Sequence, residues 1–328
     1  MFAEADKWEK VMIRFGILGC GSIARSFCDG ASHAKDAEVV AVASKSPERA
    51  KALADEKGIR RAYGSYEELL NDPEVDAVYI ATTTNYHYEN VKQCLAAGKH
   101  VLCEKAMVET EARARELFAL AAEKKLFLME GMWSRFQPKT KKVREWVTGG
   151  AIGDVVCMQA TIGFGPKRDM TNRFFNPDLG GGAWYDIGVY LADLLPYFVD
   201  QDLEDISCDM ICADSGVDAV LNINMKLTSC LANGQASLYC RMPETCYIYG
   251  TDGMIVIPGI HFGGEAIRYD AQGAEAERFE DPEPYRFCYE INEVTECITS
   301  GRLTSETDSP EMTYATSRLY DRFCPVKK

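Results

Sequence analysis

The sequence predicts an α/β protein in two parts: an N-terminal, doubly wound parallel sheet, and a C-terminal α+β domain with a large, mainly antiparallel, open sheet. Three observations support this prediction. The chain has 328 residues, which is enough for about two domains. Its first half alternates short apolar runs with longer segments of helical period, the pattern of β-α-β units. Its second half has longer alternating runs that follow one another closely, which favours antiparallel pairing.

The first half is expected to form five parallel strands joined by helices. Ser46 and Pro47 supply an N-cap and a first-turn proline for a helix over residues 48–57, which Gly58 then ends. Asn85 is expected to cap another helix, which runs to residue 97 and stops at Gly98. The strands are too short and too apolar to be exposed helices, and we place them at residues 13–18, 38–43, 77–81, 100–103 and 126–129.

The pattern changes after Met132, so we expect one domain over residues 1–132 and another over residues 133–328. A helix over 139–147 ends at two glycines, and alternating strands follow. Turns at Ala232-Asn233-Gly234 and Thr251-Asp252-Gly253 are expected to join neighbouring strands. We place the strands at residues 155–162, 219–227, 231–241 and 245–249, and the closing helices at 284–299 and 309–323.

Composition and charge argue against several classes of protein. Acidic residues number 50 against 36 basic ones, so the net charge of −14 repels nucleic-acid phosphates and anionic membrane surfaces. No apolar run approaches the roughly 18 residues of a membrane span, and the charged start does not resemble a signal peptide. The 13 cysteines form no CxxC pair and the 4 histidines are not spaced as ligands, which predicts reduced thiols and no metal site. We therefore expect a cytoplasmic protein that binds neither nucleic acid nor membrane.

The first motif with a chemical meaning lies between the first strand and the helix that follows it. The sequence Gly19-Cys20-Gly21-Ser22-Ile23-Ala24 matches the dinucleotide-binding pattern, which is informative in a strand-turn-helix setting. The first glycine makes a tight turn, the second lets the backbone approach a pyrophosphate at the helix N-terminus, and small Ala24 lets the helix pack closely on the strand. A glycine turn that binds nothing is the weaker interpretation. We expect cofactor contacts from Gly19, Gly21, Ser22, Ile23 and Ala24.

The end of the second strand predicts which dinucleotide binds. A carboxylate there would hydrogen-bond the ribose of NAD, whereas cations would bind the 2′-phosphate of NADP. This sequence has no acid at the strand end but has Ser44, Lys45, Ser46 and, slightly further on, Arg49, which can surround a phosphate. NADP is therefore preferred, and NAD stays possible. The alternative is that Lys45 and Arg49 are ordinary solvated charges.

Further segments carry a resemblance to a known family. Glu104-Lys105 ends the strand at 100–103, and the glycine-rich segment from Gly180 to Tyr190 begins a helix in the second half. Together with the motif at Gly19, these segments resemble the Gfo/Idh/MocA family over nearly the whole chain. Residues 130–136 are similar to the crossover segment of the glucose-fructose oxidoreductase and dimeric dihydrodiol dehydrogenase branch. The resemblance implies an N-terminal Rossmann domain, a nicotinamide cofactor and redox chemistry on a sugar, polyol or diol.

The resemblance also implies the reacting residues. Oxidation of a carbinol needs a group that takes the hydroxyl proton beside a polarising group. Lys105 is at the carboxyl edge of the sheet, where partial burial would lower its pKa. Asp186 and Tyr190 are four apart and share a helix face; the resemblance makes Tyr190 the proton donor or acceptor and Asp186 an orienting group. Without the resemblance, Lys105 would be interpreted as a solvated lysine and Tyr190 as a core tyrosine. The implied cofactor contacts are Thr82, Thr83, Thr84, Asn85, His87, Glu104, Lys105, Trp133 and Arg135.

The sequence departs from the family pattern in three places. Ala106 follows Lys105 where the family usually has proline, and Thr83 and Thr84 replace its usual Pro and Asn. Tyr190 stands where inositol-dehydrogenase-like members and NAD-dependent glycosidases tend to have histidine, which disfavours both. We therefore expect an NADP-dependent oxidoreductase that transfers a hydride to or from a sugar, polyol or cyclic diol. The alternatives are a cofactor-sensing regulatory protein without turnover and an NAD-dependent glycosidase. Side chains of the loop around residues 164–175 are expected to select the substrate.

The C-terminal sheet predicts an assembly. One face is expected to cover the helix at 186–194, and the other to be apolar. Because a large exposed apolar face is rare in a monomer, we expect a homodimer or a homotetramer built from two dimers. The alternative is a monomer in which the two closing helices cover that face. The residues expected on it are Val156, Met158, Ile223, Met225, Leu238 and Cys240.

Overall fold

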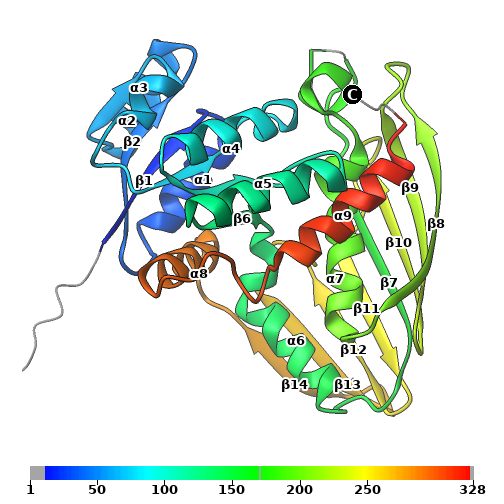
Figure 1. Ribbon diagram of the computed structural model, residues 1–328. Helices are drawn as coiled ribbons and strands as arrows, with labels where there is room; N and C mark the ends of the chain where they lie inside the picture. Colours follow the sequence, from blue (N-terminus) through cyan, green and yellow to red (C-terminus); the bar gives the residue numbers. More distant parts are fainter. Residues whose placement is uncertain (1–11, 170, 326–328) are drawn as a thin grey trace, which may run out of the picture.

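The computed structural model describes residues 12–169 and 171–325. These residues form two sheets, one of six strands and one of eight (Figure 1). Helices pack on both faces of the first sheet and on the inner face of the second. This arrangement confirms the predicted fold class. Among these residues no helix has the length and apolar character needed to cross a membrane.

The N-terminal sheet is parallel throughout, with strand order β3-β2-β1-β4-β5-β6. This is the doubly wound order in which the chain reverses direction between β1 and β4. Its strands are β1 (Ile13–Leu18), β2 (Ala37–Ala43), β3 (Arg61–Tyr63), β4 (Ala77–Ile80), β5 (His100–Glu104) and β6 (Leu128–Gly131). The connecting helices are α1 (Ser22–Ala31), α2 (Pro47–Lys57), α3 (Tyr66–Leu70), α4 (His87–Ala96) and α5 (Glu111–Lys124).

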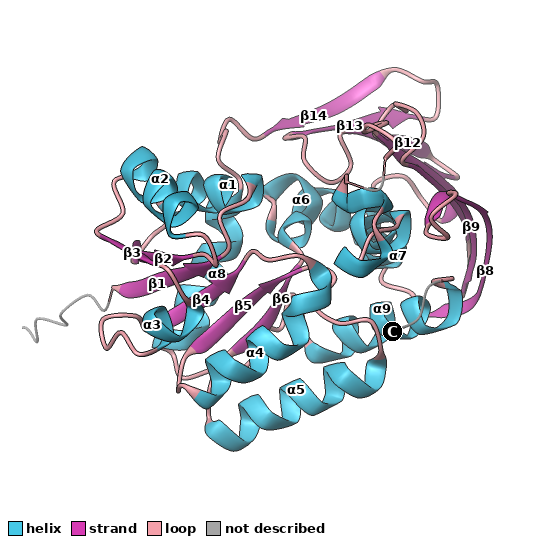
Figure 2. Ribbon diagram, turned by 90° about the horizontal axis from the view of Figure 1, so that it is seen from above, coloured by secondary structure: helices cyan, strands magenta, loops and turns pink. Residues whose placement is uncertain are grey.

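The last two helices of the chain return to the first sheet. Helix α8 (Phe287–Thr299) packs against α1, and α9 (Pro310–Phe323) packs against α5 and α7. Figure 2 shows α1, α2 and α8 on one side of the parallel strands and α4 and α5 on the other. Helix α8, near the end of the chain, therefore lies in the same helical layer as α1, near its beginning. The domain boundary between residues 132 and 133 stays a prediction.

The C-terminal sheet has the order β14-β13-β12-β11-β7-β10-β9-β8, and each neighbouring pair except β7 with β10 is antiparallel. The inner face packs on α6 (Pro138–Thr148) and on α7 (Val189–Val199), which is almost entirely buried. The strands are β7 (Val155–Gly163), β8 (Leu203–Cys212), β9 (Asp218–Leu227), β10 (Leu231–Ser237), β11 (Thr245–Gly250), β12 (Gly253–Pro258), β13 (Glu265–Asp270) and β14 (Glu275–Glu280). Short helical turns are η1 (Thr84–Tyr86), η2 (Trp133–Phe136), η3 (Arg173–Phe175), η4 (Pro177–Leu179) and the π-helical η5 (Trp184–Gly188).

Local sequence signals predicted both ends of α2 correctly, but missed the start of α4 and of β6. The Ser46 side chain accepts a hydrogen bond from the Arg49 N–H and caps α2, and Gly58 ends that helix with φ of +68°. The cap predicted at Asn85 is wrong, because its side chain bonds the Thr83 hydroxyl at 2.7 Å and α4 begins only at His87. The strand predicted at 126–129 is β6, which starts two residues later.

One predicted turn lies inside a strand. Asn233 and Gly234 are part of β10, where Asn233 donates hydrogen bonds to the side chains of Asn222 and Asn224. A Cβ at Gly234 would lie 3.1 Å from the Leu191 side chain, so glycine lets α7 approach the sheet closely. The strand predicted at 231–241 ends at Ser237, whose hydroxyl accepts the N–H groups of the two following turn residues, Tyr239 and Cys240.

The strands β3, β8, β12, β13 and β14 were not predicted. Strand β3 has only three residues. Strands β8, β13 and β14 carry charged residues on their exposed faces, which weakens the apolar signal.

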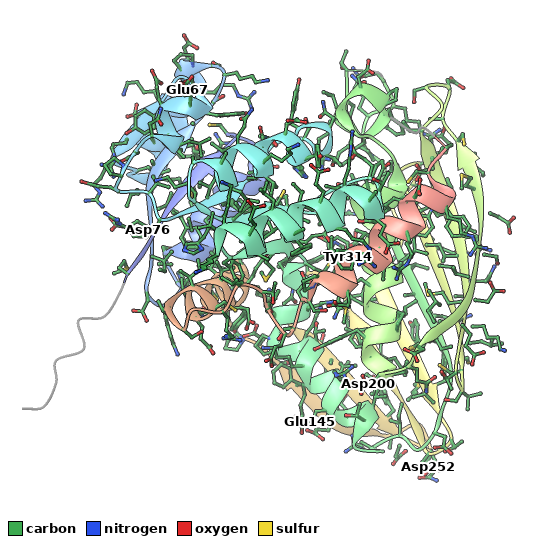
Figure 3. The ribbon with its side chains drawn as sticks, in the orientation of Figure 1. Glu67, Asp76, Glu145, Asp200, Asp252 and Tyr314 are labelled. Atoms are coloured by element: carbon green, nitrogen blue, oxygen red, sulfur yellow. The ribbon has the colours of Figure 1, made fainter. Side chains whose placement is uncertain are left out.

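Acidic side chains are spread over both parts of the molecule, as the labelled Glu67, Glu145, Asp200 and Asp252 show (Figure 3).

The predicted apolar outer face was wrong in most of its residues. Four of the six, Met158, Ile223, Met225 and Leu238, lie in the core, whereas Val156 is 54% exposed and Cys240 is also exposed. A β-bulge explains why Val156 and Met158 do not share a face. Tyr249 pairs with Cys157 and Gly250 with Val155, so Val156 is an extra residue and the in-out alternation changes there.

Candidate active site

A cleft with a volume of about 800 Å³ lies between the carboxyl ends of the parallel strands and the inner face of the second sheet. Its lining comes from the glycine loop after β1, the ends of β2, β4 and β5, the segment from η3 to η5, and residues next to β11 and β12. Ligands of open parallel sheets bind at this edge, at the point where the strand order reverses. No cluster of metal-ligating side chains occurs among residues 12–169 and 171–325.

The glycine loop has the geometry that a pyrophosphate requires. Gly19 has φ of +104°, and a Cβ there would lie 2.6 Å from the Ala81 carbonyl oxygen. Gly21 has no atom within 4 Å of the place a Cβ would take, so its backbone is open to the cleft. Helix α1 starts at Ser22 without a side-chain cap, which leaves its first N–H groups available to an anion. The loop fits a dinucleotide.

The end of β2 supplies polar and cationic groups to the same cleft. Ser44, Lys45, Ser46 and Arg49 all line it. The Lys45 ammonium lies 4.2 Å from the centroid of the Tyr86 ring, which also lines the cleft. Within the described part of the chain, no carboxylate lines this end of the cleft.

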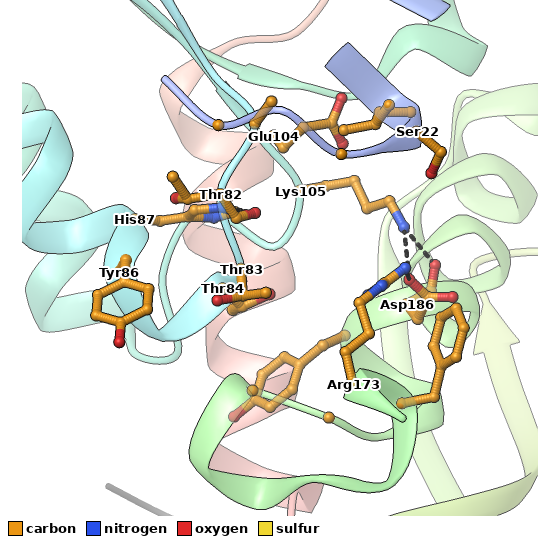
Figure 4. Close-up of a pocket in the computed structure, with 18 of the residues that line it drawn as sticks. Ser22, Thr82, Thr83, Thr84, Tyr86, His87, Glu104, Lys105, Arg173 and Asp186 are labelled. Atoms are coloured by element: carbon orange, nitrogen blue, oxygen red, sulfur yellow. Dashed lines mark hydrogen bonds and ion pairs between the residues drawn. The ribbon is translucent and has the colours of Figure 1, made fainter. Parts of the chain in front are cut away.

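At the other end, three charged side chains meet. Lys105 Nζ donates to the Asp186 backbone oxygen at 2.6 Å and lies 3.4 Å from Asp186 Oδ1. Arg173 Nη2 approaches the same Oδ1 at 3.0 Å (Figure 4). Lys105 Nζ is 4.9 Å from the centroid of the Tyr190 ring. Lys105, Asp186 and Tyr190 are thus in one place, although 81 residues separate the first two.

The π-helical turn η5 explains how Asp186 reaches the cleft. It contains Asp186 and leads directly into α7, whose second residue is Tyr190. Such single π turns are frequent at functional sites because they turn side chains away from the regular helical spacing. Glycines precede it, and the segment Gly180 to Gly182 also lines the cleft.

The ionisation of this group differs from the prediction for Lys105. Burial by itself would lower the pKa of Lys105, but the Asp186 carboxylate, together with Tyr190 and Glu104, raises it above its ordinary value. Burial raises the pKa of Tyr190 to about 12, against the opposing effects of Lys105 and of a hydrogen bond from Trp133. Burial by itself would raise the pKa of Asp186, but the charges of Lys105 and Arg173 outweigh it, so this pKa ends below its usual range. Both Lys105 and Tyr190 therefore hold a proton at neutral pH.

Neighbouring residues fix the tyrosine and the lysine. Trp133 Nε1 donates a hydrogen bond of 2.9 Å to Tyr190 Oη, and the Trp133 ring stacks on Phe287. His87 is buried, with Nδ1 2.8 Å from the carbonyl oxygen of Ala106 and Nε2 3.1 Å from that of Thr82. It therefore joins the loop after β5 to the loop after β4. The Lys105–Ala106 peptide is cis.

Most residues predicted to contact a cofactor line this cleft, and three do not. Ala24 is a fully buried residue of α1, in agreement with the packing role predicted for it. Asn85 does not line the cleft, and its side chain accepts a hydrogen bond from the Thr83 hydroxyl. Arg135 is buried in an ion pair with Asp193, 2.6 Å away, so it cannot contact a ligand in the cleft. Of the residues predicted for cofactor contact or catalysis, those that line the cleft are Gly19, Gly21, Ser22, Ile23, Ser44, Lys45, Arg49, Thr82, Thr83, Thr84, His87, Glu104, Lys105, Trp133, Asp186 and Tyr190.

The structure adds residues that the sequence did not single out. Arg173, with Phe164 and Phe174, comes from the loop predicted only as a substrate selector. Glu244 and His261 come from loops next to strands of the second sheet, and neither belongs to a recognisable motif. The one sequence sign near them is the run of glycines around His261, which permits a tight loop there but does not say what the loop faces.

Two family descriptions match most of the chain. Residues 13–132 match "Oxidoreductase family, NAD-binding Rossmann fold", and residues 140–256 match "GFO/IDH/MocA C-terminal domain". The chain is 36% identical over 324 residues to the trans-1,2-dihydrobenzene-1,2-diol dehydrogenase of Mus musculus, covering 94% of this chain and 93% of the mouse protein. It is 41% identical over 199 residues to the D-xylose 1-dehydrogenase (NADP(+)) of Hypocrea jecorina, covering 54% of this chain and 51% of that protein.

Solved structures are similar over almost the full length. The aldose-aldose oxidoreductase from Caulobacter crescentus, complexed with glycerol, has a TM-score of 0.86 at 25% identity, covering 95% of this chain and 96% of that one. A 3-ketoreductase from Actinomadura kijaniata, in complex with NADP and TDP-benzene, has a TM-score of 0.84 at 26% identity, covering 94% and 96%. The similarity thus includes both sheets and the cleft between them.

Proposed function

Because the chain belongs to the Gfo/Idh/MocA family of oxidoreductases, we propose that it uses NADP to interconvert a hydroxyl and a carbonyl group on a cyclic diol, polyol or sugar. The observation that carries this proposal is the meeting of Lys105, Asp186 and Tyr190 at one end of the cleft that begins at the glycine loop. Similarity to a diol dehydrogenase over 94% of the chain supports a diol among these substrates. The relatives reported above are dehydrogenases, oxidoreductases or reductases by name, which favours an enzyme over a cofactor sensor or a glycosidase.

The residues of the cleft fit a nicotinamide dinucleotide. The open backbone at Gly21 and the uncapped start of α1 would hold its pyrophosphate, and Lys45, Arg49 and the serines Ser44 and Ser46 would hold a 2′-phosphate. When bound, the cofactor supplies or accepts the hydride. The protein supplies the position of the substrate and the movement of the proton.

The protonated state of the site suits carbonyl reduction. Tyr190 Oη holds a proton at neutral pH and would donate it to the substrate oxygen, while the Lys105 ammonium would donate a hydrogen bond to that oxygen. Asp186 and Arg173 hold Lys105 and the rim of the cleft in place. In the oxidative direction the same tyrosine must first lose its proton, so oxidation is expected to be faster at alkaline pH.

A direct test uses the purified protein, NADPH and a panel of substrates. We expect NADPH fluorescence to change on binding, and NADP⁺ to be reduced in the presence of trans-1,2-dihydrobenzenediol, D-xylose or a related polyol. Binding of NADPH without turnover of any diol, polyol, sugar or corresponding carbonyl compound would favour the cofactor-sensing alternative. No binding of either NADPH or NADH would contradict the proposal.

The cofactor preference depends on the end of β2. Lys45→Asp places a carboxylate where the 2′-phosphate is expected, so it should repel NADP and accept the ribose hydroxyls of NAD. We expect the ratio of NADP to NAD affinity to fall by about 100-fold, a change of about 2.7 kcal/mol. Titration of cofactor fluorescence measures it, and Lys51→Asp, further along α2, is the control. An unchanged ratio in Lys45→Asp would remove this residue from the cofactor site.

Trp133 is expected to position the tyrosine. Trp133→Phe keeps the stacking on Phe287 but removes the hydrogen bond to Tyr190 Oη, which helps to lower the pKa of that tyrosine. Loss of one such bond should slow oxidation by about tenfold and move its pH-rate profile to higher pH. Rates measured from pH 7 up to pH values around the pKa of Tyr190 measure both effects. A slower variant with an unshifted profile would indicate a merely structural role.

We also propose that the chain forms a homodimer through the outer face of the second sheet. The closing helices do not cover this face, because they pack on α1, α5 and α7. Ile211 is 58%, Leu231 61% and Tyr247 38% exposed on it, and pairing would bury them. Light scattering at micromolar concentration should give twice the chain mass of 36.5 kDa, and a value near 36.5 kDa would contradict the dimer. The predicted cytoplasmic location remains a prediction.

A further inference from the structure

Two polar side chains of the cleft have no part in the chemistry described above. Glu244 lies just before β11, and His261 lies in the loop after β12. Glu244 Oε2 and His261 Nδ1 are 3.7 Å apart, and both atoms are buried. Within the described part of the chain, neither atom has a hydrogen-bond partner. Leaving buried polar atoms unpaired is costly, so this pair points to a ligand group that satisfies both atoms.

The backbone holds the pair rigidly. The Ile260 N–H donates to the Glu244 backbone oxygen at 2.9 Å, which joins the two loops. Gln137 Nε2 donates to the His261 backbone oxygen at 2.9 Å, and the buried Lys139 ammonium donates to the Gly259 oxygen. These bonds hold the two loops in place, and both side chains line the cleft, as a specificity site requires.

The pair lies beside the proposed reaction centre. The imidazole of His261 stacks on the Tyr190 ring, with centroids 4.6 Å apart and an angle of 26° between planes. Burial, together with the Lys105 and Lys139 charges, lowers the pKa of His261 to about 3, so the ring is neutral at physiological pH. A ligand group bound to His261 is thus next to one bound at Tyr190.

The chemistry of the two atoms selects a hydroxyl group. A carboxylate oxygen only accepts hydrogen bonds, whereas a neutral imidazole that carries its proton on Nδ1 donates one there. A hydroxyl donates one bond and accepts another, so it can donate to Glu244 and accept from His261 at the same time. Two atoms 3.7 Å apart can both lie about 2.8 Å from one oxygen between them. A methylene group leaves both atoms unpaired.

We propose that Glu244 and His261 form a subsite for a second hydroxyl of the substrate, on the carbon next to the one that reacts, so that the cleft selects 1,2-diols over simple alcohols. The proposal rests on the proposed function, because it takes the Tyr190 end of the cleft as the place of reaction. It adds the feature of the substrate that is recognised and the two residues that recognise it.

The test compares two alcohols that differ by one hydroxyl, trans-1,2-cyclohexanediol and cyclohexanol, with NADP⁺. We expect the unmodified enzyme to prefer the diol by about 100-fold or more in kcat/KM. His261→Phe keeps a ring on Tyr190 but removes both nitrogens, and Glu244→Leu removes the acceptor. Each should lower kcat/KM for the diol by about 100-fold and change that for cyclohexanol little, so that the preference is lost. Glu244→Gln, which retains an acceptor oxygen, should restore part of it.

The chain offers a matched control. His33 also has Nδ1 beside a carboxylate, that of Glu283 at 3.3 Å, and its ring lies 4.6 Å from that of Tyr285, but it does not line the cleft. His33→Phe makes the same chemical change outside the cleft and should keep the full preference for the diol. A loss of preference in His33→Phe as large as in His261→Phe would overturn the subsite.

A binding measurement separates this proposal from the proposed function. The complex of the protein with NADPH is titrated with each alcohol, and the fluorescence of bound NADPH or the heat of binding is recorded. If neither alcohol is oxidised but the diol binds more tightly than cyclohexanol and His261→Phe removes the difference, the subsite stands and the proposed reaction fails. If the enzyme oxidises alcohols but binds and oxidises both equally, or if the variants do not change the preference, the subsite is wrong and the reaction stands. Absence of diol binding in the unmodified complex also overturns the subsite.

Discussion

Lys105→Ala and Tyr190→Phe are each expected to lower turnover by on the order of 100-fold or more, with cofactor affinity changed only a few-fold. In the proposed mechanism, Tyr190 donates a proton to the substrate oxygen, and the Lys105 cation stabilises charge on that oxygen. Tyr190 is buried and the Lys105 side chain is only 12% exposed, and neither belongs to the glycine loop or to the end of β2, so their loss leaves the proposed phosphate contacts intact. Steady-state rates at saturating cofactor, with NADPH fluorescence titrations, measure the two quantities separately.

Tyr247→Phe is the matched control for the tyrosine, because it removes a hydroxyl from an exposed ring on the second sheet, away from the cleft lining. Its turnover should equal that of the unmodified enzyme. If both Lys105→Ala and Tyr190→Phe retain turnover within about threefold, the assignment of these residues to the reaction is wrong, since lost acid-base groups cost far more. A parallel loss of cofactor affinity would instead indicate a collapsed cleft.

Arg135→Met is expected to reduce the free energy of unfolding by about 3–5 kcal/mol while leaving cofactor affinity unchanged in the folded protein. Arg135 and Asp193 are each only 3% exposed and are joined by hydrogen bonds of 2.6 to 2.9 Å. Removing the guanidinium leaves the Asp193 carboxylate buried without its partner. Urea unfolding at neutral pH measures the loss, and fluorescence titration measures the cofactor affinity.

Two further variants test whether the loss of stability comes from the unpaired buried charge. The double variant with Arg135→Met and Asp193→Leu removes both charges and should recover most of the stability, because an apolar pair of similar volume can replace a buried ion pair. The pair Arg14 and Asp76 is about one-third exposed, so Arg14→Met should cost only about 0–1 kcal/mol. Unchanged stability with a large loss of cofactor affinity in Arg135→Met would restore the cofactor role first predicted for Arg135.

The sequence by itself determined the features that depend on residues close together in the chain. The glycine loop between a strand and a helix, the cap at Ser46 and the stop at Gly58 were predicted because each depends on a few neighbouring residues. The parallel sheet followed from repeated apolar strands separated by helices, since strands buried on both faces are apolar throughout. Lys105, Asp186 and Tyr190 were singled out through a family resemblance. The spacing of Asp186 and Tyr190 places them on one helix face, but nothing local shows that Lys105 lies beside them.

Only the tertiary structure decided which distant groups become partners. Arg135 looked like a cofactor contact and is instead neutralised by Asp193, since burial of a guanidinium requires a nearby carboxylate that a local pattern cannot reveal. The pKa of Lys105 rises rather than falls because Asp186 lies beside it. An extra residue at Val156 reverses the in-out alternation, and α7 requires a glycine at position 234, inside a strand. Glu244 and His261, which are far from Tyr190 in the sequence, lie beside it only because the chain folds. Hydrogen bonding, charge pairing and close packing act through space, and the fold brings together residues that the sequence keeps apart.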